Sequence, residues 1–515
     1  MYSFKLILLS FFGIMCCGQC YNFLGVFPIP IKSHMIVFAK LMKELAKKGH
    51  NVTVISTFPE KNYLPNYRDV DLSAYIPKMV EVMVISEEQS DSKMVRYVGP
   101  TMTSAFADLV CEGLSSRPYQ DFLKENLTFD AIILESFNTE CYVSIAHKFK
   151  APIIGFSSSG ILSWTQERFG IPKIPSYLPD IFLGLSDRMS FFERVENTLV
   201  TFFHNLFHKF YRIVKDKEVV RKHVGSAAAA NLESLVNNMS LFLVSTHFTL
   251  NLPRPFTPNV IEVGGIHIDE PKALPKNLNK WINDSPGGII YFSMGSMTSG
   301  QTFPEKRVKA FINAFDLLPH RVIWKWENKT MEGKTDKILI QKWLPQLDIL
   351  CNPNVKLFIS HGGMLGIMEA VYCGVPILLL PQYGDQHNNA KSLEATGAGV
   401  ILRLSEVTKE TAYRAMLKAL RLSNEMKALS NRFKDRPLPP LETAVYWTEY
   451  VVRQNGAPFM KTAAVDMPFY QYYLLDVLLF IFSILFLVVY ILFFIIKFIL
   501  SKLQCTTKVY KHKMS

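Results

Sequence analysis

The chain has 515 residues, which exceeds the usual size of one hydrophobic core, so at least two domains are expected. Hydrophobic residues make up 49% and charged residues 19%, which excludes a disordered protein and suits globular domains with added membrane segments. The formal net charge of +12 does not indicate nucleic-acid binding, because part of the basic excess lies in the tail 497–515 and no basic stripe, zinc module or aromatic RNA-binding motif is present.

The N-terminus is typical of a secretory signal peptide, which we expect over residues 1–20. Lys5 precedes an apolar run over residues 6–17, and small residues follow that run. A buried first strand is the alternative, but residues 22–27 already supply that strand. We therefore expect the folded part of the chain to lie in the lumen of the secretory pathway.

A second membrane signal lies near the C-terminus, where residues 477–496 carry no charge and are long enough to cross a bilayer as a helix. Tyrosines precede this segment and a basic tail over 497–515 follows it, as expected for an interfacial aromatic belt and a cytoplasmic end. Lys511 and Lys513 resemble a dilysine signal for retrieval to the endoplasmic reticulum (ER). The sequence thus predicts a single-pass type I protein of the ER membrane.

Four cysteines fall in the expected lumenal part, namely Cys111, Cys141, Cys351 and Cys373. Their spacing is not that of metal ligands. The oxidising compartment permits disulfides, but the sequence neither requires one nor fixes a pairing.

The predicted fold class is α/β, because buried strands alternate with amphipathic helices in both halves of the chain. A helix over 35–48, for example, has apolar residues at i, i+3, i+4 and i+7 and ends at Gly49. Strands are expected at 23–28, 52–56, 129–134, 153–157, 288–293, 321–326, 356–360 and 375–380.

Prolines punctuate residues 251–286, which we interpret as a linker between a domain over 21–250 and a domain over 287–475. Two doubly wound, Rossmann-like domains that face each other leave a cleft at the carboxyl ends of their strands, where ligands bind in this architecture.

Residues 191–215 carry large apolar side chains at helical spacing. These are Phe192, Val195, Leu199, Phe202, Leu206 and Phe210. We expect a helix packed on its own domain. The alternative is a surface helix that dips into the membrane interface.

The residues from Trp343 to Gln386 combine features that suit a nucleotide-sugar. A tryptophan face can stack on a uracil ring, and Gln346 can pair with a base or ribose edge. His361 ends a strand ahead of Gly363, where a helix opens, so backbone N–H groups and the helix dipole can meet a pyrophosphate.

Three further side chains complete this pattern. Glu369 lies in the same helix and can accept hydrogen bonds from ribose hydroxyls, while Asp385 and Gln386 follow another strand and can bind sugar hydroxyls. Each residue alone also fits core packing or a tight turn. The order and spacing of the whole set are what make it specific.

This set resembles the signature of the UDP-glycosyltransferase family, the group that contains the animal UDP-glucuronosyltransferases. The resemblance covers nearly the whole chain, including residues 23–54, 261–265, 292–296 and 440–464, and residues 137–139 look most like the insect branch. It implies two Rossmann-like domains of the GT-B type, with the acceptor on the N-terminal half and the UDP-sugar on the C-terminal half. It also implies anomeric inversion, no metal, no cofactor beyond the UDP-sugar co-substrate, and Ser296 and Gly366 among the donor-binding residues.

The family's catalytic base is a histidine just after the first strand, which here is His34. A neutral imidazole at that position faces the cleft and can take an acceptor proton near pH 7. A carboxylate partner would stabilise the imidazolium, and here the chain departs from the vertebrate pattern, which has Asp after the strand that matches 129–134. Glu135 occupies that position, and Glu140 follows at an expected helix start. We favour Glu135 and keep Glu140 as the rival.

A second departure is Leu365, where many members carry Asn near the donor phosphates. Two other function classes stay open, namely a catalytically silent binding protein of the same fold and a retaining hydrolase with two carboxylates about 5 Å apart. The acceptor pocket is expected in the loops 62–85 and 97–114, and an apolar lining would favour small lipophilic acceptors such as phenols, hormones or plant toxins. The insect-like residues favour glucose over glucuronic acid as the sugar, and a homo-oligomer is an open alternative to a monomer.

Overall fold

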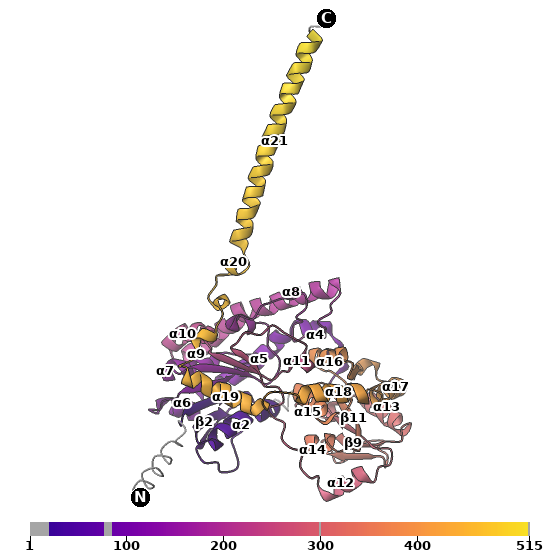
Figure 1. Cartoon of the computed structure of the whole chain (residues 1–515). Coiled ribbons are helices and arrows are strands. Elements are labelled where there is room, and N and C mark those ends of the chain that lie inside the picture. The colour runs from indigo at the N-terminus through magenta and orange to yellow at the C-terminus, as the bar shows by residue number, and fades with distance from the viewer. Residues whose placement is uncertain (1–19, 77–84, 298–299, 513–515) are drawn as a thin grey trace, which may run out of the picture. The chain divides into compact units, whose positions relative to one another are not determined.

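The computed structural model describes residues 20–76, 85–297 and 300–512, in two compact units, Met1–Lys461 and Thr462–Ser515 (Figure 1). Three sequence-based expectations fall partly or wholly outside the described residues: the signal peptide up to residue 19, Lys513 of the dilysine pattern, and residues 77–84 of the expected acceptor loop.

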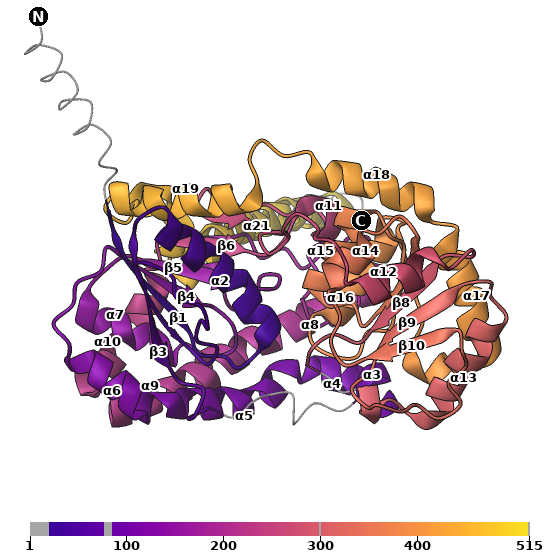
Figure 2. The same ribbon diagram turned by 90° about the horizontal axis from the view of Figure 1, so that it is seen from below.

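The first unit contains a seven-stranded parallel sheet with the order β3-β2-β1-β4-β5-β6-β7 (Figure 2). Its strands are β1 Asn22–Phe27, β2 Asn51–Ser56, β3 Tyr67–Asp71, β4 Ala131–Glu135, β5 Ile153–Ser157, β6 Leu241–Val244 and β7 Val260–Glu262. The chain winds outward in one direction from β1 and in the other from β4. The carboxyl ends of β1 and β4 therefore border the crevice at which such sheets bind ligands.

A second parallel sheet in the same unit has six strands in the order β10-β9-β8-β11-β12-β13. Its strands are β8 Ile289–Ser293, β9 Arg321–Lys325, β10 Ile338–Gln341, β11 Val355–Ser360, β12 Ile377–Leu379 and β13 Gly399–Ile401. The winding direction reverses between β8 and β11. The predicted α/β class with two Rossmann-like sheets is confirmed.

Helices cover the sheets. The N-terminal half contributes α2 Lys32–Lys47, α3 Glu87–Asp91, α4 Lys93–Tyr97, α5 Gly99–Glu112, α6 Arg117–Lys124, α7 Ile145–Phe149, α8 Phe191–Phe207, α9 Ile213–His223, α10 Ser226–Asn237 and α11 Phe248–Asn251. The C-terminal half contributes α12 Lys276–Asn283, α13 Glu305–Asp316, α14 Gln346–Leu350, α15 Met364–Cys373, α16 Gln386–Ala395, α17 Lys409–Leu420, α18 Ser423–Lys434 and α19 Pro440–Arg453.

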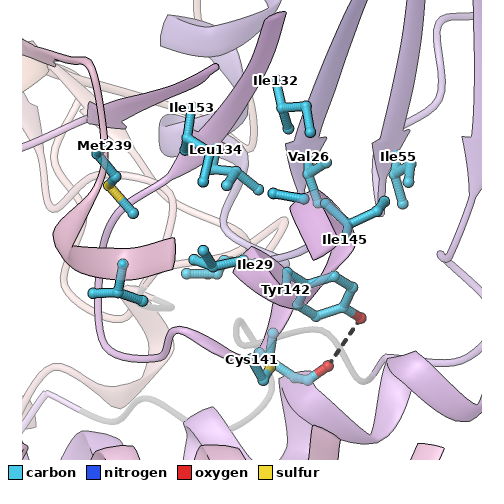
Figure 3. Close-up of a cluster of buried hydrophobic side chains, with 14 of the residues drawn as sticks. Val26, Ile29, Ile55, Ile132, Leu134, Cys141, Tyr142, Ile145, Ile153 and Met239 are labelled. Carbon is cyan, nitrogen blue, oxygen red and sulfur yellow. Dashed lines mark hydrogen bonds between the residues drawn. The ribbon is translucent and has the colours of Figure 1, made fainter. Parts of the chain in front are cut away.

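Both faces of the first sheet are buried, which explains the continuous apolar runs of its strands. On one face, Val26 and Leu134 belong to a buried cluster with Tyr142 and Ile145 (Figure 3). On the other face, the neighbouring Phe27 belongs to a different cluster. That second cluster includes side chains of both α2 and α19, so the last helix of this unit returns to the N-terminal sheet.

The expected linker over 251–286 contains regular structure. β7 lies inside it and pairs with β6, and α12 follows before the second sheet begins. The first sheet thus extends further along the chain than the predicted boundary at residue 250. β7 has only three residues and follows a proline-rich stretch, so it gives little periodic signal.

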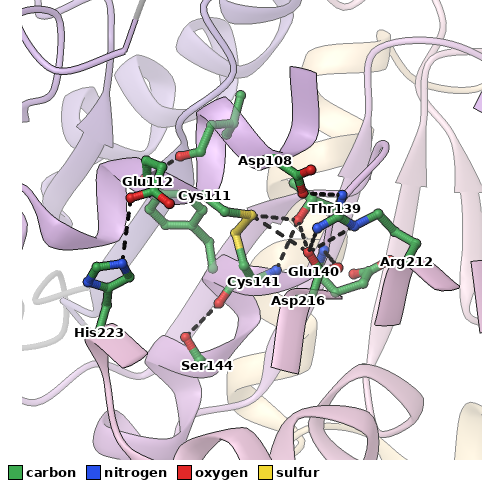
Figure 4. The surroundings of a disulfide bond; sticks show 12 residues. Asp108, Cys111, Glu112, Thr139, Glu140, Cys141, Ser144, Arg212, Asp216 and His223 are labelled. Atoms are coloured by element: carbon green, nitrogen blue, oxygen red, sulfur yellow. Dashed lines mark hydrogen bonds and ion pairs between the residues drawn. A yellow bond between two sulfur atoms is a disulfide. The ribbon is translucent and has the colours of Figure 1, made fainter. Parts of the chain in front are cut away.

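Two disulfides, Cys111–Cys141 and Cys351–Cys373, resolve the pairing that the sequence left open. Beside the first, the Asp216 carboxylate accepts a hydrogen bond from the Thr139 hydroxyl at 2.6 Å and pairs with Arg212 (Figure 4). Sulfur and carboxylate atoms of Cys111, Cys141 and Asp216 lie within 4.8 Å of one another, but the two sulfurs are joined to each other. This cluster is a structural link between α5 and the chain after β4.

The helix over 191–215 differs from the expectation. It consists of α8, a π-helical turn over His208–Arg212 and the start of α9. Its apolar stripe is not packed against the domain: Phe192 is 80% exposed and Phe210 is 67% exposed. The interpretation of a helix packed by its apolar face was therefore wrong.

The second unit contains α20 Phe469–Tyr472 and α21 Leu475–His512. Residues Leu475–Leu503 of α21 are long and apolar enough to cross a membrane, and the predicted span 477–496 lies within them. No other helix among the described residues meets that criterion of length and hydropathy.

Candidate active site

The first half of the site forms where β1 and β4 end side by side. Val26 of β1 is in register with Leu134 of β4, so the loop after β1 and the residue after Leu134 meet at one edge of the sheet. His34 lies in the first turn of α2, which follows that loop, and Glu135 is the last residue of β4.

His34 and Glu135 are in direct contact. The distance from His34 Nδ1 to Glu135 Oε1 is 2.7 Å, and the side chains are only 13% and 2% exposed. The His34 ring also meets the edge of the Phe137 ring, with centroids 5.1 Å apart. The ring is thus fixed by one hydrogen bond and one aromatic contact, and its Nε2 does not take part in the bond to Glu135.

Burial raises the pKa of Glu135, and the hydrogen bond and charge of His34 oppose that rise. The C-terminal half adds a second carboxylate here. Burial raises the pKa of Asp385 as well, and among the opposing causes are the hydrogen bond from Asn389 and the charge of His34. Asp385 belongs to the C-terminal half of the unit, so the charge of His34 acts on a carboxylate of the opposite half.

Glu140, the rival partner, does not lie beside His34. Its buried carboxylate pairs with Arg168, Nη1 to Oε1 2.6 Å, and lies 3.6 Å from Nε2 of His208. Burial alone would raise the pKa of Glu140, but the charge of Arg168 and the hydrogen bonds from His208 and Arg168 outweigh it, so the net pKa is lowered. Glu140 therefore holds a buried ion pair.

The second half of the site forms where β8 and β11 end side by side, with Ser293 in register with Ser360. His361 follows β11, and its ring lies between Gly295 and Gly363. A Cβ added to either glycine would come within 2.5 Å of the ring, so only glycine fits at both places. Ser296 follows Gly295 and is half-buried.

Burial, with a smaller contribution from Lys325, lowers the pKa of His361 to about 4. Its imidazole is therefore neutral at physiological pH. The buried Nδ1 atom of His361 has no hydrogen-bond partner. This ring can offer an uncharged hydrogen-bonding group at the mouth of the second sheet.

Just beyond His361, α15 begins after Gly363 with no side-chain cap on its first N–H groups. Glu369 lies further along α15 and accepts a hydrogen bond from Gln346 Nε2 at 2.6 Å. Burial raises the pKa of Glu369 to about 7. Gly366 lies close to the Gln346 amide, since a Cβ there would be 3.3 Å from Nε2.

Trp343 is 58% exposed, so an aromatic face is open to a ligand. Lys32, which the sequence interpretation missed, reaches over this ring from α2, with Nζ 3.6 Å from the ring centroid. Burial and the charges of Lys61 and Lys325 lower the pKa of Lys32. In the sequence, the only sign of a role for Lys32 is its position two residues before His34. Its contact with Trp343 becomes visible only in the folded structure.

Asp385 and Gln386 lie at the start of α16. The Asp385 carboxylate accepts a hydrogen bond from Asn389 at 2.8 Å, and the Gln386 side-chain oxygen accepts one from the Gln382 N–H at 2.9 Å. Leu365 occupies the position at which the resembled family often has Asn. It packs against the N-terminal core, and its carbonyl accepts a hydrogen bond from His267 Nε2 at 3.3 Å.

The comparisons with known proteins agree with this geometry. A family model described as UDP-glucoronosyl and UDP-glucosyl transferase matches residues 25–512. The chain belongs to the UDP-glycosyltransferase family. It is 41% identical over 484 residues to UDP-glycosyltransferase UGT5 of Dactylopius coccus, covering 90% of this chain and 89% of that protein. It is 33% identical over 469 residues to UDP-glucuronosyltransferase 1A10 of Homo sapiens, covering 88% and 87%.

Among solved structures, a UDP-glucosyltransferase from Polygonum tinctorium capable of glucosylating indoxyl matches with a TM-score of 0.55 at 16% identity, over 85% of this chain and 99% of that one. This likeness shows the shared GT-B fold. The chain is therefore a UDP-glycosyltransferase, an enzyme that uses a UDP-sugar as donor, and both the family and the fold expected from its motifs are confirmed.

Proposed function

We propose that this UDP-glycosyltransferase transfers a hexose, glucose in the first place, onto a small lipophilic acceptor with inversion at the anomeric carbon. The observation that carries the proposal is the His34–Glu135 contact, 2.7 Å from Nδ1 to Oε1, at the carboxyl ends of β1 and β4. In this proposal Asp385 of the C-terminal half holds the sugar. A base on one side and a sugar-binding carboxylate on the other are what an in-line displacement needs.

In this proposal His34 is the general base. Its Nδ1–H donates to Glu135, which leaves the lone pair of Nε2 free for the acceptor hydroxyl. The proton moves from the acceptor oxygen to Nε2 while that oxygen forms a bond to the anomeric carbon. The bond between that carbon and the UDP oxygen breaks, and UDP leaves with the electron pair. Glu135 stabilises the imidazolium that results.

In this proposal, different residues bind the different parts of the UDP-sugar. Trp343 stacks on uracil, and Gln346 and Glu369, already hydrogen-bonded to each other, hold the base edge and the ribose hydroxyls. The diphosphate lies at the uncapped start of α15, beside His361. Asp385 and Gln386 hold the sugar hydroxyls. The UDP-sugar is a co-substrate, and no further cofactor takes part.

Ser296, Gly363 and Gly366 line the diphosphate position in this arrangement. The two glycines let backbone approach the ligand closely, and Ser296 offers a hydroxyl. We add Lys32 to these residues, because its ammonium group lies over Trp343 and within the influence of Lys325.

An apolar wall supports a lipophilic acceptor. Phe137 touches His34 and also packs against a buried cluster formed by Leu162, Trp164, Ile181 and Phe182. A phenol or a similar flat acceptor could lie against Phe137 with its hydroxyl directed at His34.

The names of similar proteins support glucose as the transferred sugar. UDP-glucosyltransferase 2 of Dactylopius coccus is 36% identical over 490 residues, covering 93% of each chain. Glucuronic acid is the second candidate, because relatives named UDP-glucuronosyltransferases are 32–33% identical. We further propose an ER location, with α21 as the membrane span and the enzyme part in the lumen.

A donor screen tests this proposal. The full chain in microsomes is incubated with one phenol and UDP-glucose or UDP-glucuronic acid, and the product mass and anomeric configuration are measured. A β-glucoside from the α-configured donor is expected. Retained configuration would contradict the displacement, and donor binding without any product would favour a silent binding protein.

A further inference from the structure

The disulfide Cys351–Cys373 joins the two helices that carry the candidate uridine-binding side chains. Cys351 directly follows α14, which begins with Gln346, and Cys373 is the last residue of α15, which carries Glu369. The two helices are in contact (Figure 2), and Cys373 Sγ lies 3.8 Å from the Leu347 carbonyl of α14. The bridge therefore ties α14 to α15 about one helical turn away from the residues that hold the donor.

The donor side of these two helices is held by a short chain of hydrogen bonds. The Tyr291 hydroxyl donates to the Gln346 side-chain oxygen at 3.2 Å, and Gln346 Nε2 donates to the Glu369 carboxylate at 2.6 Å. Tyr291 is fully buried and lies on β8, inside the second sheet. The bond between Gln346 and Glu369 depends on how α14 lies against α15. A covalent link between the other ends of the helices therefore helps to fix it.

This disulfide can be reached from outside without entry into the donor cleft. Cys351 and Cys373 are half-buried and line a cavity of about 570 Å³. Val355, the first residue of β11, also lines that cavity, which places it at the amino ends of the strands, whereas the donor residues follow the carboxyl ends. The other disulfide differs, because Cys111 and Cys141 are completely buried.

The wall of this cavity is basic. Apart from the cysteines, its titratable side chains are His320, Lys356 and Lys427, and no carboxylate of the described residues lines it. Burial and the charge of Lys356 lower the pKa of His320, while both lysines are exposed. Positive surroundings stabilise a thiolate and attract an anionic reactant, and both effects favour exchange between a disulfide and a small thiol.

We infer that Cys351–Cys373 is a thiol-exchange site, at which a small anionic thiol opens the bridge and thereby weakens UDP-sugar binding. The thiolate attacks one sulfur of the bridge, the S–S bond breaks, and the other cysteine leaves as a thiolate. A second thiolate of the same kind attacks the mixed disulfide. Two thiols are thus oxidised to one disulfide, and their two protons end on Cys351 and Cys373. The effect on the donor rests on the roles proposed above for Gln346 and Glu369.

The size of the effect follows from linkage between the two sites. Coupling between sites usually changes an affinity about 5–150-fold, and we expect the lower end, about fivefold, because α14 and α15 stay packed through Ile349, Ile367 and Val371 when the bridge is open. Linkage is reciprocal. Saturating UDP-glucose should therefore shift the reduction equilibrium of Cys351–Cys373 by the same factor, whereas a bridge that only stabilises the fold would not respond to the donor.

Selective reduction tests this inference on the full chain in detergent. The enzyme is incubated with reduced glutathione, an anionic thiol, free cysteines are alkylated and mapped by mass spectrometry, and the Kd for UDP-glucose is measured by isothermal calorimetry. Cys351 and Cys373 should be alkylated while Cys111 and Cys141 stay paired. The Kd should rise about fivefold and return on reoxidation. Loss of both bridges together, or an unchanged Kd after selective reduction, would overturn the inference.

Two double variants sharpen this test. Cys351→Ser with Cys373→Ser should show the raised Kd without any thiol and no response to glutathione. Lys356→Gln with Lys427→Gln should slow exchange with glutathione but not with the neutral thiol 2-mercaptoethanol, which is the matched control for charge. Equal slowing with both thiols would contradict the preference for an anion. If the serine variant does not fold, reduction of the unaltered chain decides alone.

Gln346→Ala separates a failure of this inference from a failure of the proposed donor site. If that variant binds UDP-glucose more weakly and selective reduction has no effect, the thiol-exchange site is wrong and the donor assignment stands. If Gln346→Ala leaves the Kd unchanged, the donor assignment is wrong and the inference falls with it. A weaker affinity in both cases supports the two together.

Discussion

Replacing Glu135 with Gln removes the charge beside His34 and keeps the side-chain shape. Two opposite charges about 4 Å apart interact by about 4 kcal/mol at an effective dielectric constant of 20, and the burial of both groups keeps water from screening them. The amide of Gln can still accept the Nδ1–H bond, which recovers part of this energy. A net loss of about 3 kcal/mol from imidazolium stabilisation lowers kcat about a hundredfold.

Glu140→Gln is the matched control, because it makes the same chemical change at a buried glutamate nearby in sequence. It leaves Arg168 buried without its full partner, so we expect a loss of stability of about 3–5 kcal/mol and a lower Tm. Turnover per folded molecule should hardly change. The assay is glucosylation of a phenol by the purified full chain in detergent, with the folded fraction counted by UDP-glucose binding. Normal kcat in Glu135→Gln, or an equal fall in both variants, would refute the reasoning.

Three further predictions concern the donor and the membrane. The carboxylate of Glu369, whose pKa burial raises to about 7, should become ionised as pH rises from 6 to 8. UDP-glucose affinity should therefore increase up to about tenfold over that range, and Glu369→Gln should abolish the dependence; isothermal calorimetry measures both. Trp343→Ala should raise the KM for UDP-glucose about tenfold or more with kcat little changed, because base stacking is removed, and an unchanged KM would argue against stacking. Deleting residues 476–515 should release the protein from carbonate-washed membranes with UDP-glucose binding intact, and retention would mean that α21 is not the only anchor.

The pairing of His34 with Glu135 could be anticipated from the sequence, because both follow buried strands and parallel strands end at one edge of a sheet. The role of Glu140 could not, since its partner Arg168 comes from the 3-10 helix Gln166–Phe169, which is too short to give a periodic signal. The contact of Lys32 with Trp343 joins the two halves of the unit and depends on how they face each other.

The helix α8 shows why an apolar stripe is ambiguous on its own. The spacing of its phenylalanines correctly predicted a helix, but the expectation that this apolar side packs on the domain was wrong. Which side is buried was decided by two polar residues, Asn197 and His204, whose partners lie elsewhere in the chain. Likewise β7 and β13, with three residues each, are too short for periodicity to reveal and form because neighbouring strands offer them hydrogen bonds.

The role of His34 as general base is the central claim, and one substitution tests it most directly. His34→Ala removes the imidazole at the end of β1 and leaves every donor-binding residue in place. Measured with saturating phenol and UDP-glucose, turnover should fall about 10²–10⁴-fold while the Kd for UDP-glucose stays within about twofold of the unaltered enzyme. Near-normal turnover of the folded alanine variant would contradict the account.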